Sequence, residues 1–287
     1  MTGAATPQPG IFAMGSRAHY YLELDARPGA DPAAVRAATA AALEGPQAAT
    51  AGVNVVVAFG GALADVVAPF EPIVGSDGFT MPATQHDVWV WIAAGGPDVA
   101  FDVARSVTAA LAPFATVATQ RHAFAYLDSK DMSGFEDGTE NPSVAEAPLV
   151  ATRPATGGSV VLVQRWVHDL ANLHARSVEE QEAVIGRTKA TSEELDDKPA
   201  TAHIARVVIE DDEGEELEIW RRSTPYGDIE EHGLVFVAFA SDRERLDRML
   251  GRMAGTDGVR DALTTWSTPV SGAYYYAPPL EELASAG

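Results

Sequence analysis

The strongest constraint on the fold is a repeated order of predicted elements, strand-helix-strand-strand-helix-strand, which runs through the chain twice. In the first half, the periodicity of apolar residues predicts strands at 19–24, 53–59, 87–92 and 115–126, and helices at 31–43 and 97–111. In the second half, it predicts strands at 158–167, 203–210, 216–222, 234–240 and 271–277, and helices at 177–187 and 242–253. This order predicts an α+β fold of two ferredoxin-like halves, each an antiparallel sheet with helices on one face.

Local signals define several of these elements. Ser177 and Glu180 have the spacing of a capping box, which predicts a helix start, and Asp242 is expected to cap the helix that follows it. The acidic run around Glu213 and Gly214 predicts the turn of a hairpin between segments 203–210 and 216–222.

The two halves are joined by a polar segment rich in Gly, Asp, Asn and Pro. We therefore expect an N-terminal half at 1–132, a connecting segment at 133–157 and a C-terminal half at 158–287. A joint of this composition between two halves is a common place for a ligand site.

The chain has no cysteine. Disulfides, iron–sulfur clusters, thiolate-bound or covalently attached haem and cysteine-based zinc sites are therefore excluded. Redox chemistry in this chain would need a bound cofactor that is held by His, carboxylate or backbone groups.

The formal net charge of −21 bears on the choice of partners. A negative field repels phosphate backbones, so we expect no nucleic-acid partner. No apolar run is long enough for a membrane span, and the first residues have neither a basic head nor an apolar stretch, so we expect no membrane association and a cytoplasmic location. The charge serves solubility in the simplest interpretation; attraction of cationic substrates is the alternative.

The connecting segment contains the string Gly-Phe-Glu-Asp-Gly-Thr-Glu-Asn-Pro at 134–142. Asp-Gly alone indicates only a turn. The longer string resembles the signature loop of dye-decolourising peroxidases, in the form found in their cytoplasmic bacterial (B-type) branch. Further matches follow in the family's order along the whole chain, at 167–170, 177–189 and 221–227, with His203 between the last two.

The resemblance implies a haem b peroxidase, with one haem per chain, that reduces hydrogen peroxide through a ferryl intermediate and oxidises dyes, phenolics or similar donors. It places Asp137 and Arg221 on the peroxide side of the iron and His203 on the other side, as the protein ligand of the metal. It also implies haem contacts from Gly138, Thr139, Arg187 and His168.

The chemistry of these residues agrees with such roles. Peroxide activation needs a base that moves a proton between the two oxygens and a cation that stabilises charge as their bond breaks. Asp137 is a base only when it is ionised; a neighbouring guanidinium such as that of Arg221 lowers a carboxylate pKa, whereas burial raises it. A carboxylate in place of imidazole predicts activity weighted toward acid pH.

Two features of the sequence qualify this interpretation. An ideal hairpin would place His203 and Arg221 about 5 Å apart, so either His203 precedes the strand on a loop or the hairpin splays. The family's C-terminal run also carries an acid that accepts the second N–H of the proximal histidine, and the matching stretch at 263–267 has none, with Thr265 in its place. We therefore expect a proximal histidine without a carboxylate partner, with Asp261, four residues earlier, as the alternative source.

The resemblance also implies the partners of this chain. We expect hydrogen peroxide and a small-molecule electron donor to bind, and a homo-oligomer is possible. Relatives that are packaged in protein nanocompartments carry a longer C-terminal extension than the given sequence shows. We therefore expect a free protein and not a packaged one. A haem transport or iron-release protein is the rival function, because it shares His203 and the fold but does not require Asp137 and Arg221.

Overall fold

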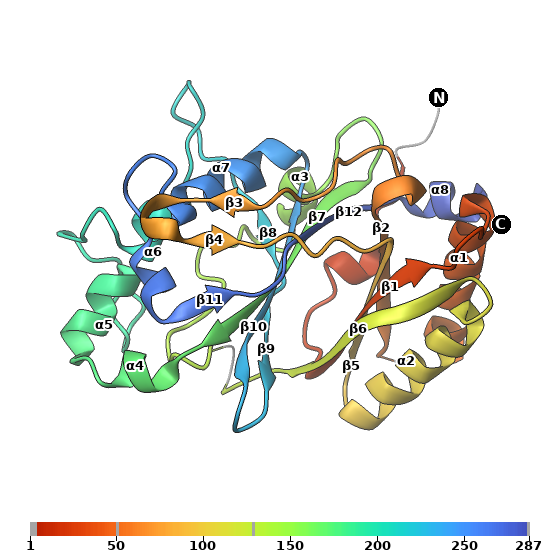
Figure 1. Ribbon diagram of the computed structural model, residues 1–287, viewed down its shortest axis with the longest axis horizontal. Helices are drawn as coiled ribbons and strands as arrows, with labels where there is room; N and C mark the ends of the chain where they lie inside the picture. The colour runs from red at the N-terminus through yellow and green to blue at the C-terminus, as the bar shows by residue number, and fades with distance from the viewer. Residues whose placement is uncertain (1–4, 50–51, 128–129, 286–287) are drawn as a thin grey trace.

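The computed structural model describes residues 5–49, 52–127 and 130–285 (Figure 1). Residues 1–4 and 286–287, on which the expectations about a leader and a C-terminal extension partly rest, lie outside the described residues. The strands are β1 (Ala18–Ala26), β2 (Asn54–Phe59), β3 (Ile73–Val74), β4 (Thr80–Met81), β5 (Val88–Ala94), β6 (Ala115–Phe124), β7 (Ser159–His168), β8 (Trp220–Arg221), β9 (Thr224–Gly227), β10 (His232–Ala240), β11 (Ser267–Pro269) and β12 (Ala273–Ala277). The helices are α1 (Pro32–Ala49), α2 (Pro97–Leu111), α3 (Ala147–Ala151), α4 (Leu170–His174), α5 (Val178–Ile185), α6 (His203–Val207), α7 (Arg243–Ala254) and α8 (Leu280–Ser285), with short 3-10 helices η1 (Pro9–Ile11), η2 (Gly61–Leu63), η3 (Ser76–Gly78) and η4 (Ala262–Thr265).

The main sheet closes on itself. Its strands follow the order β7-β12-β2-β5-β1-β6-β9-β10, and β10 pairs again with β7, so that these strands form a closed antiparallel barrel. The N-terminal strands meet the C-terminal strands at two narrow seams, Tyr276↔Phe59 and Ala123↔Tyr226. β8 and β11 extend the barrel at the ends of β10 and β7.

This closure corrects the expected fold class. Two ferredoxin-like halves, each with its own antiparallel sheet and helices on one face, are not what the structure contains, because strands of both halves form one barrel. Local periodicity predicts single strands, whereas the seams are pairings between residues more than 100 positions apart, which no local signal reports.

The barrel separates two apolar layers because side chains alternate along each strand. One layer fills the interior with aromatic rings, among them Tyr21, Trp89, Trp91, Phe239 and Tyr275. The other layer lies outside, where α1, α2 and α7 cover the strands. An eight-stranded barrel is just wide enough for side chains to fill, which agrees with this packing.

Several local predictions are confirmed. The Ser177 capping box is formed and starts α5, Asp242 caps α7, and α2 has the predicted bounds. The prediction of a hairpin between 203–210 and 216–222 is wrong. His203 begins helix α6, and the two segments are paired by an isolated bridge between Glu210 and Glu216. Among the described residues, no helix is both long and apolar enough to cross a membrane.

Barrel closure can be tested at Gly233, where β10 passes close to β7. A Cβ atom at this position would lie 2.0 Å from the carbonyl oxygen of Trp166, so the strands would have to separate. We expect Gly233→Ala to lower the free energy of unfolding in a denaturant titration by about 1–3 kcal/mol, the usual cost of overpacking. Gly95→Ala is the matched control, because its Cβ would have no atom within 4 Å. Equal stability of the two variants would contradict close pairing at this point.

Candidate active site

A cavity lies on the outer face of β7 and β10, where residues of α6 and α7 also line it. It encloses about 1110 Å³ of non-protein space, part of which is open to solvent. This one cavity is lined by all the residues that the resemblance places at the haem: Asp137, Gly138, Thr139, His168, Arg187, His203 and Arg221. Its remaining walls are mostly apolar, with Ile204, Val207, Leu234, Phe236, Met249, Leu250, Leu263 and Trp266.

His203 is the first residue of α6 and is held by a buried carboxylate. Its Nδ1 lies 2.7 Å from Oδ2 of Asp261, whose side chain is 0% exposed, compared with 23% for His203. Asp261 caps the 3-10 helix η4, and its Oδ1 accepts a hydrogen bond of 2.8 Å from the backbone N–H of Leu263. Because Nδ1 is engaged, the Nε2 atom of His203 is the one available to bind a metal.

This pair corrects the expectation that the proximal histidine lacks a carboxylate partner. The acid comes from Asp261, which was the alternative, and Thr265 at the expected place is exposed and bonded to the carbonyl of Ala262. The difference arises because the carboxylate is supplied by the residue that caps η4 and not by a residue within that helix.

The loop at 134–142 carries Asp137 and is fastened to the strand that carries Arg221. Gly134 and Gly138 have φ values of 88° and 80°, a backbone conformation that favours glycine. The side chain of Asn141 donates to the carbonyl of Arg221 and accepts from its N–H, both at 2.9 Å. Arg221 itself pairs with Ala238 of β10. Two hydrogen bonds therefore fix the loop against the barrel.

Asp137 and Arg221 influence each other through charge. Burial raises the pKa of the Asp137 carboxyl, and the guanidinium of Arg221 opposes this rise. Among the described residues, no hydrogen bond or ion pair joins the two, and Nη2 of Arg221 is buried without a hydrogen-bond partner. A small molecule with acceptor atoms would satisfy this donor.

His168 lies in a polar cluster at another side of the cavity. Its Nδ1 is 2.8 Å from Oγ of Ser267 and its Nε2 is 3.4 Å from Oδ1 of Asp131. Burial alone would raise the pKa of Asp131, but His168 and the donors of Ser133 outweigh it and hold that pKa below its ordinary value. The sequence does not predict Asp131, Ser267 and Asn141 as site residues. Two of them carry a signal: Asn141 lies in the loop motif, and Ser267 ends the stretch at 263–267 that matches the family's C-terminal run.

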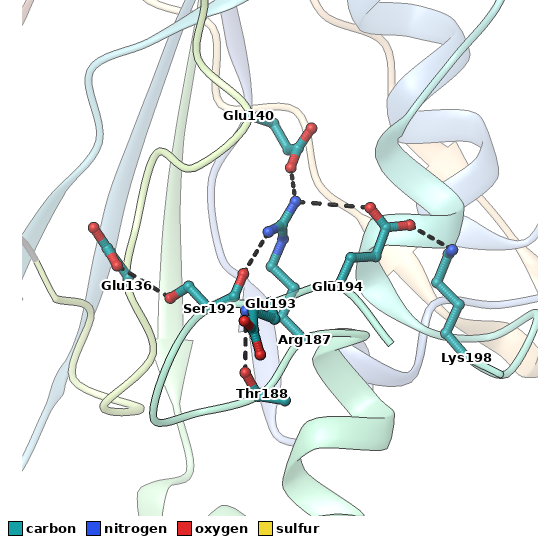
Figure 2. A network of polar contacts seen from close by, with 8 residues as sticks. All are labelled: Glu136, Glu140, Arg187, Thr188, Ser192, Glu193, Glu194 and Lys198. Atoms are coloured by element: carbon teal, nitrogen blue, oxygen red, sulfur yellow. Dashed lines mark hydrogen bonds and ion pairs between the residues drawn. The ribbon is translucent and has the colours of Figure 1, made fainter. Parts of the chain in front are cut away.

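Arg187 is the centre of an acidic network at the rim (Figure 2). It forms an ion pair with Glu140 and donates to the carbonyl of Ser192 at 2.5 Å, while Glu194 lies 3.8 Å away. Glu194 in turn pairs with Lys198. The Nε atom of Arg187 is buried and has no hydrogen-bond partner among the residues that the structure describes. Gly138 and the exposed Thr139 lie on the same side, next to Glu140.

These residues fit a haem. The apolar walls suit the porphyrin, and an imidazole with its Nδ1 bound to a carboxylate suits an axial ligand. Buried nitrogens of Arg187 and Arg221 also lack hydrogen-bond partners in the described part of the chain. Among the described residues, no group of three or more acidic or histidine ligands could hold a bare metal ion.

Comparisons with known proteins agree with this site. The family model of the N-terminal part of Dyp-type peroxidases matches residues 8–125, and that of the C-terminal part matches residues 128–282. A dye-decolorizing peroxidase of Mycobacterium tuberculosis is 38% identical over 226 residues, which are 75% of this chain and 67% of the relative. The curated relatives are longer than the match, which spans between 61% and 67% of the first two.

Solved structures are similar over nearly the whole chain. A DypB variant of Rhodococcus jostii RHA1 in complex with heme has a TM-score of 0.91 and 32% identity, covering 99% of this chain and 100% of that one. An encapsulated DyP-type peroxidase of Mycobacterium smegmatis has a TM-score of 0.90 and 30% identity, covering 98% of both chains. The expectation against packaging is therefore wrong, because a relative that matches throughout is itself encapsulated.

The resemblance read from the loop motif is thus confirmed by two family models, by curated relatives and by solved structures: the chain belongs to the Dyp-type peroxidase family.

Proposed function

We propose that this chain is a haem peroxidase that reduces hydrogen peroxide and oxidises a small-molecule electron donor. The observation that carries the proposal is one cavity with a carboxylate-bound imidazole, His203, and a separate acid–cation pair, Asp137 and Arg221. The heme complex of the R. jostii relative supports the choice of cofactor.

We assign the roles as follows. Nε2 of His203 would hold the haem iron, and Arg187 with His168, Gly138 and Thr139 would contact the rest of the group. Once bound, haem would supply the metal centre through which electrons from the donor reach the peroxide. Asp261 would keep the His203 ring in one orientation and increase its basicity.

Asp137 and Arg221 would act on the peroxide. The carboxylate of Asp137 takes a proton from one peroxide oxygen and returns it to the other, so that water leaves as the O–O bond breaks. The guanidinium of Arg221, with a buried nitrogen that lacks a partner in the described part of the chain, stabilises the negative charge that develops during this step. Simple haem carriage needs neither group, which favours peroxidase over the rival haem-handling function.

The acid-weighted activity and the choice of donor also belong to this proposal. As pH falls, the net charge of the chain becomes less negative and repels an anionic dye less. Protonation of Asp137 limits the activity at low pH, because the carboxylate works as a base only when it is ionised. Its raised pKa means that this loss of activity begins at a higher pH than for an ordinary aspartate. The domain division and the cytoplasmic location remain predictions.

Asp137→Asn and Arg221→Leu should keep haem but slow the reaction with peroxide. Loss of a positioned acid–base group costs about 10² to 10⁴ in rate, and the two losses should not add fully because both act on one transition state. Stopped-flow mixing with peroxide measures the rate, with the exposed Asp102→Asn as control. The fall in rate toward low pH should disappear in Asp137→Asn. Wild-type rates in both single variants would refute the assignment.

His203→Ala should purify with little or weakly held haem, because it removes the only proposed protein ligand of the iron. The haem content and Soret band of the purified protein measure this, and His174→Ala, on the exposed end of α4, is the control. Full haem content with an unchanged Soret band in His203→Ala would remove His203 from its role.

A further inference from the structure

A second cavity lies inside the barrel, toward the end at which β5 and β10 begin. It encloses about 670 Å³ of non-protein space, part of which is open to solvent. Small-molecule sites occupy roughly 300–1,000 Å³. β7 separates this barrel cavity from the candidate active site, and Gln164 contributes to the walls of both. The proposed peroxide chemistry makes no use of it.

The floor of the barrel cavity is aromatic. Tyr21 and Trp89 line it, with ring centroids 6.3 Å apart and planes inclined by 25°. Tyr275, which does not line the cavity, stacks on Trp89 at 6.4 Å. All three rings are buried, so Tyr21 and Trp89 are held in place by packing and form a fixed part of the wall against which another flat ring can pack.

Hydrogen-bond donors without partners lie at the same wall. Arg121 of β6 is the register partner of Tyr21. Its Nη1 donates to the carbonyl of Gln120 at 2.8 Å, whereas its Nε is buried and has no hydrogen-bond partner among the described residues. The indole Nε1 of Trp89 is also buried and unpartnered. Within the described part of the chain, no carboxylate forms an ion pair with Arg121. Buried N–H groups are nearly always bonded in folded proteins, so these two donors call for an acceptor.

The other charged groups of the cavity leave Arg121 without a competing anion. Arg165 in the opposite wall is paired with Glu231 at 2.7 Å. Glu23 is held in a short hydrogen bond of 2.5 Å from the hydroxyl of Tyr275, and burial raises the pKa of its carboxyl. Glu23 is therefore less ionised than an ordinary glutamate and repels an incoming anion less.

We propose that the barrel cavity binds a small aromatic monocarboxylate, with its ring on Tyr21 and Trp89 and its carboxylate on Arg121. A neutral aromatic compound would leave the charge of Arg121 unmatched. An inorganic anion would leave the aromatic wall without a contact. A benzoate-like molecule satisfies both, because a guanidinium and a carboxylate form charge-assisted hydrogen bonds.

The test is a calorimetric titration of the haem-loaded full chain with benzoate, with acetate and benzyl alcohol as probes that each keep one half of the ligand. Benzoate should bind more tightly than either probe and leave the Soret band unchanged. Arg121→Gln should weaken benzoate binding by about 10- to 100-fold, the effect of one lost hydrogen bond to a charged group. Arg121→Lys should retain part of the affinity.

Arg105→Gln is the matched control, because it removes the same charge from the exposed face of α2 and should bind benzoate like the wild type. The reaction with peroxide should be unchanged in Arg121→Gln, which reports correct folding and separates this proposal from the peroxidase assignment. Three results would each overturn the proposal: no benzoate binding, equal affinity in Arg121→Gln and Arg105→Gln, or a Soret shift that places benzoate at the haem.

Discussion

The pairing of β7 with β10 is the contact on which the rest of the structure depends. It runs from Gly233↔Val167 to Ala240↔Val160 and closes the barrel. Because side chains alternate, Val163 and Val235 point into the barrel, whereas Trp166 and Phe236 point outward and form the wall of the active-site cavity. A shift of the pairing by one residue would exchange these two faces, so the same register fixes both the aromatic interior and the proposed haem site.

The side chains of the candidate site are held by partners from distant parts of the chain. Asp261 holds His203 across 58 positions, Asn141 holds Arg221 across 80, and Ser267 meets His168 across 99. Each partner is itself fixed, as Asp261 is by capping η4. The site therefore forms only when these distant parts of the chain pack together, which explains why residues from the loop at 134–142, from α6 and from β8 meet around one cavity.

The sequence predicts what depends on near neighbours. The bounds of α2, the capping box at Ser177 and the place of the loop at 134–142 beside the cavity could all be predicted, since periodicity, caps and loop motifs are local signals. The closed barrel could not, because its seams rest on single distant pairs such as Ala123↔Tyr226. The β-branched residues after His203 predict a strand at 203–210, with His203 on a loop before it or on a splayed hairpin, yet this segment begins as helix α6, which packs against α7. Asp261 is only an alternative partner of His203 on sequence grounds, since its role depends on where η4 begins.

The central claim is that His203 holds the haem iron and that Asp261 tunes it. The direct measurement is the Fe(III)/Fe(II) midpoint potential of the haem-loaded protein by redox titration. A carboxylate that accepts a hydrogen bond from the Nδ1–H group makes the imidazole more anionic and lowers this potential. Asp261→Asn should therefore raise the potential relative to the wild type, while Thr265→Asp, on the exposed side of η4, should leave it unchanged. An unchanged potential in Asp261→Asn with haem fully bound, together with a shift in Thr265→Asp, would contradict the account.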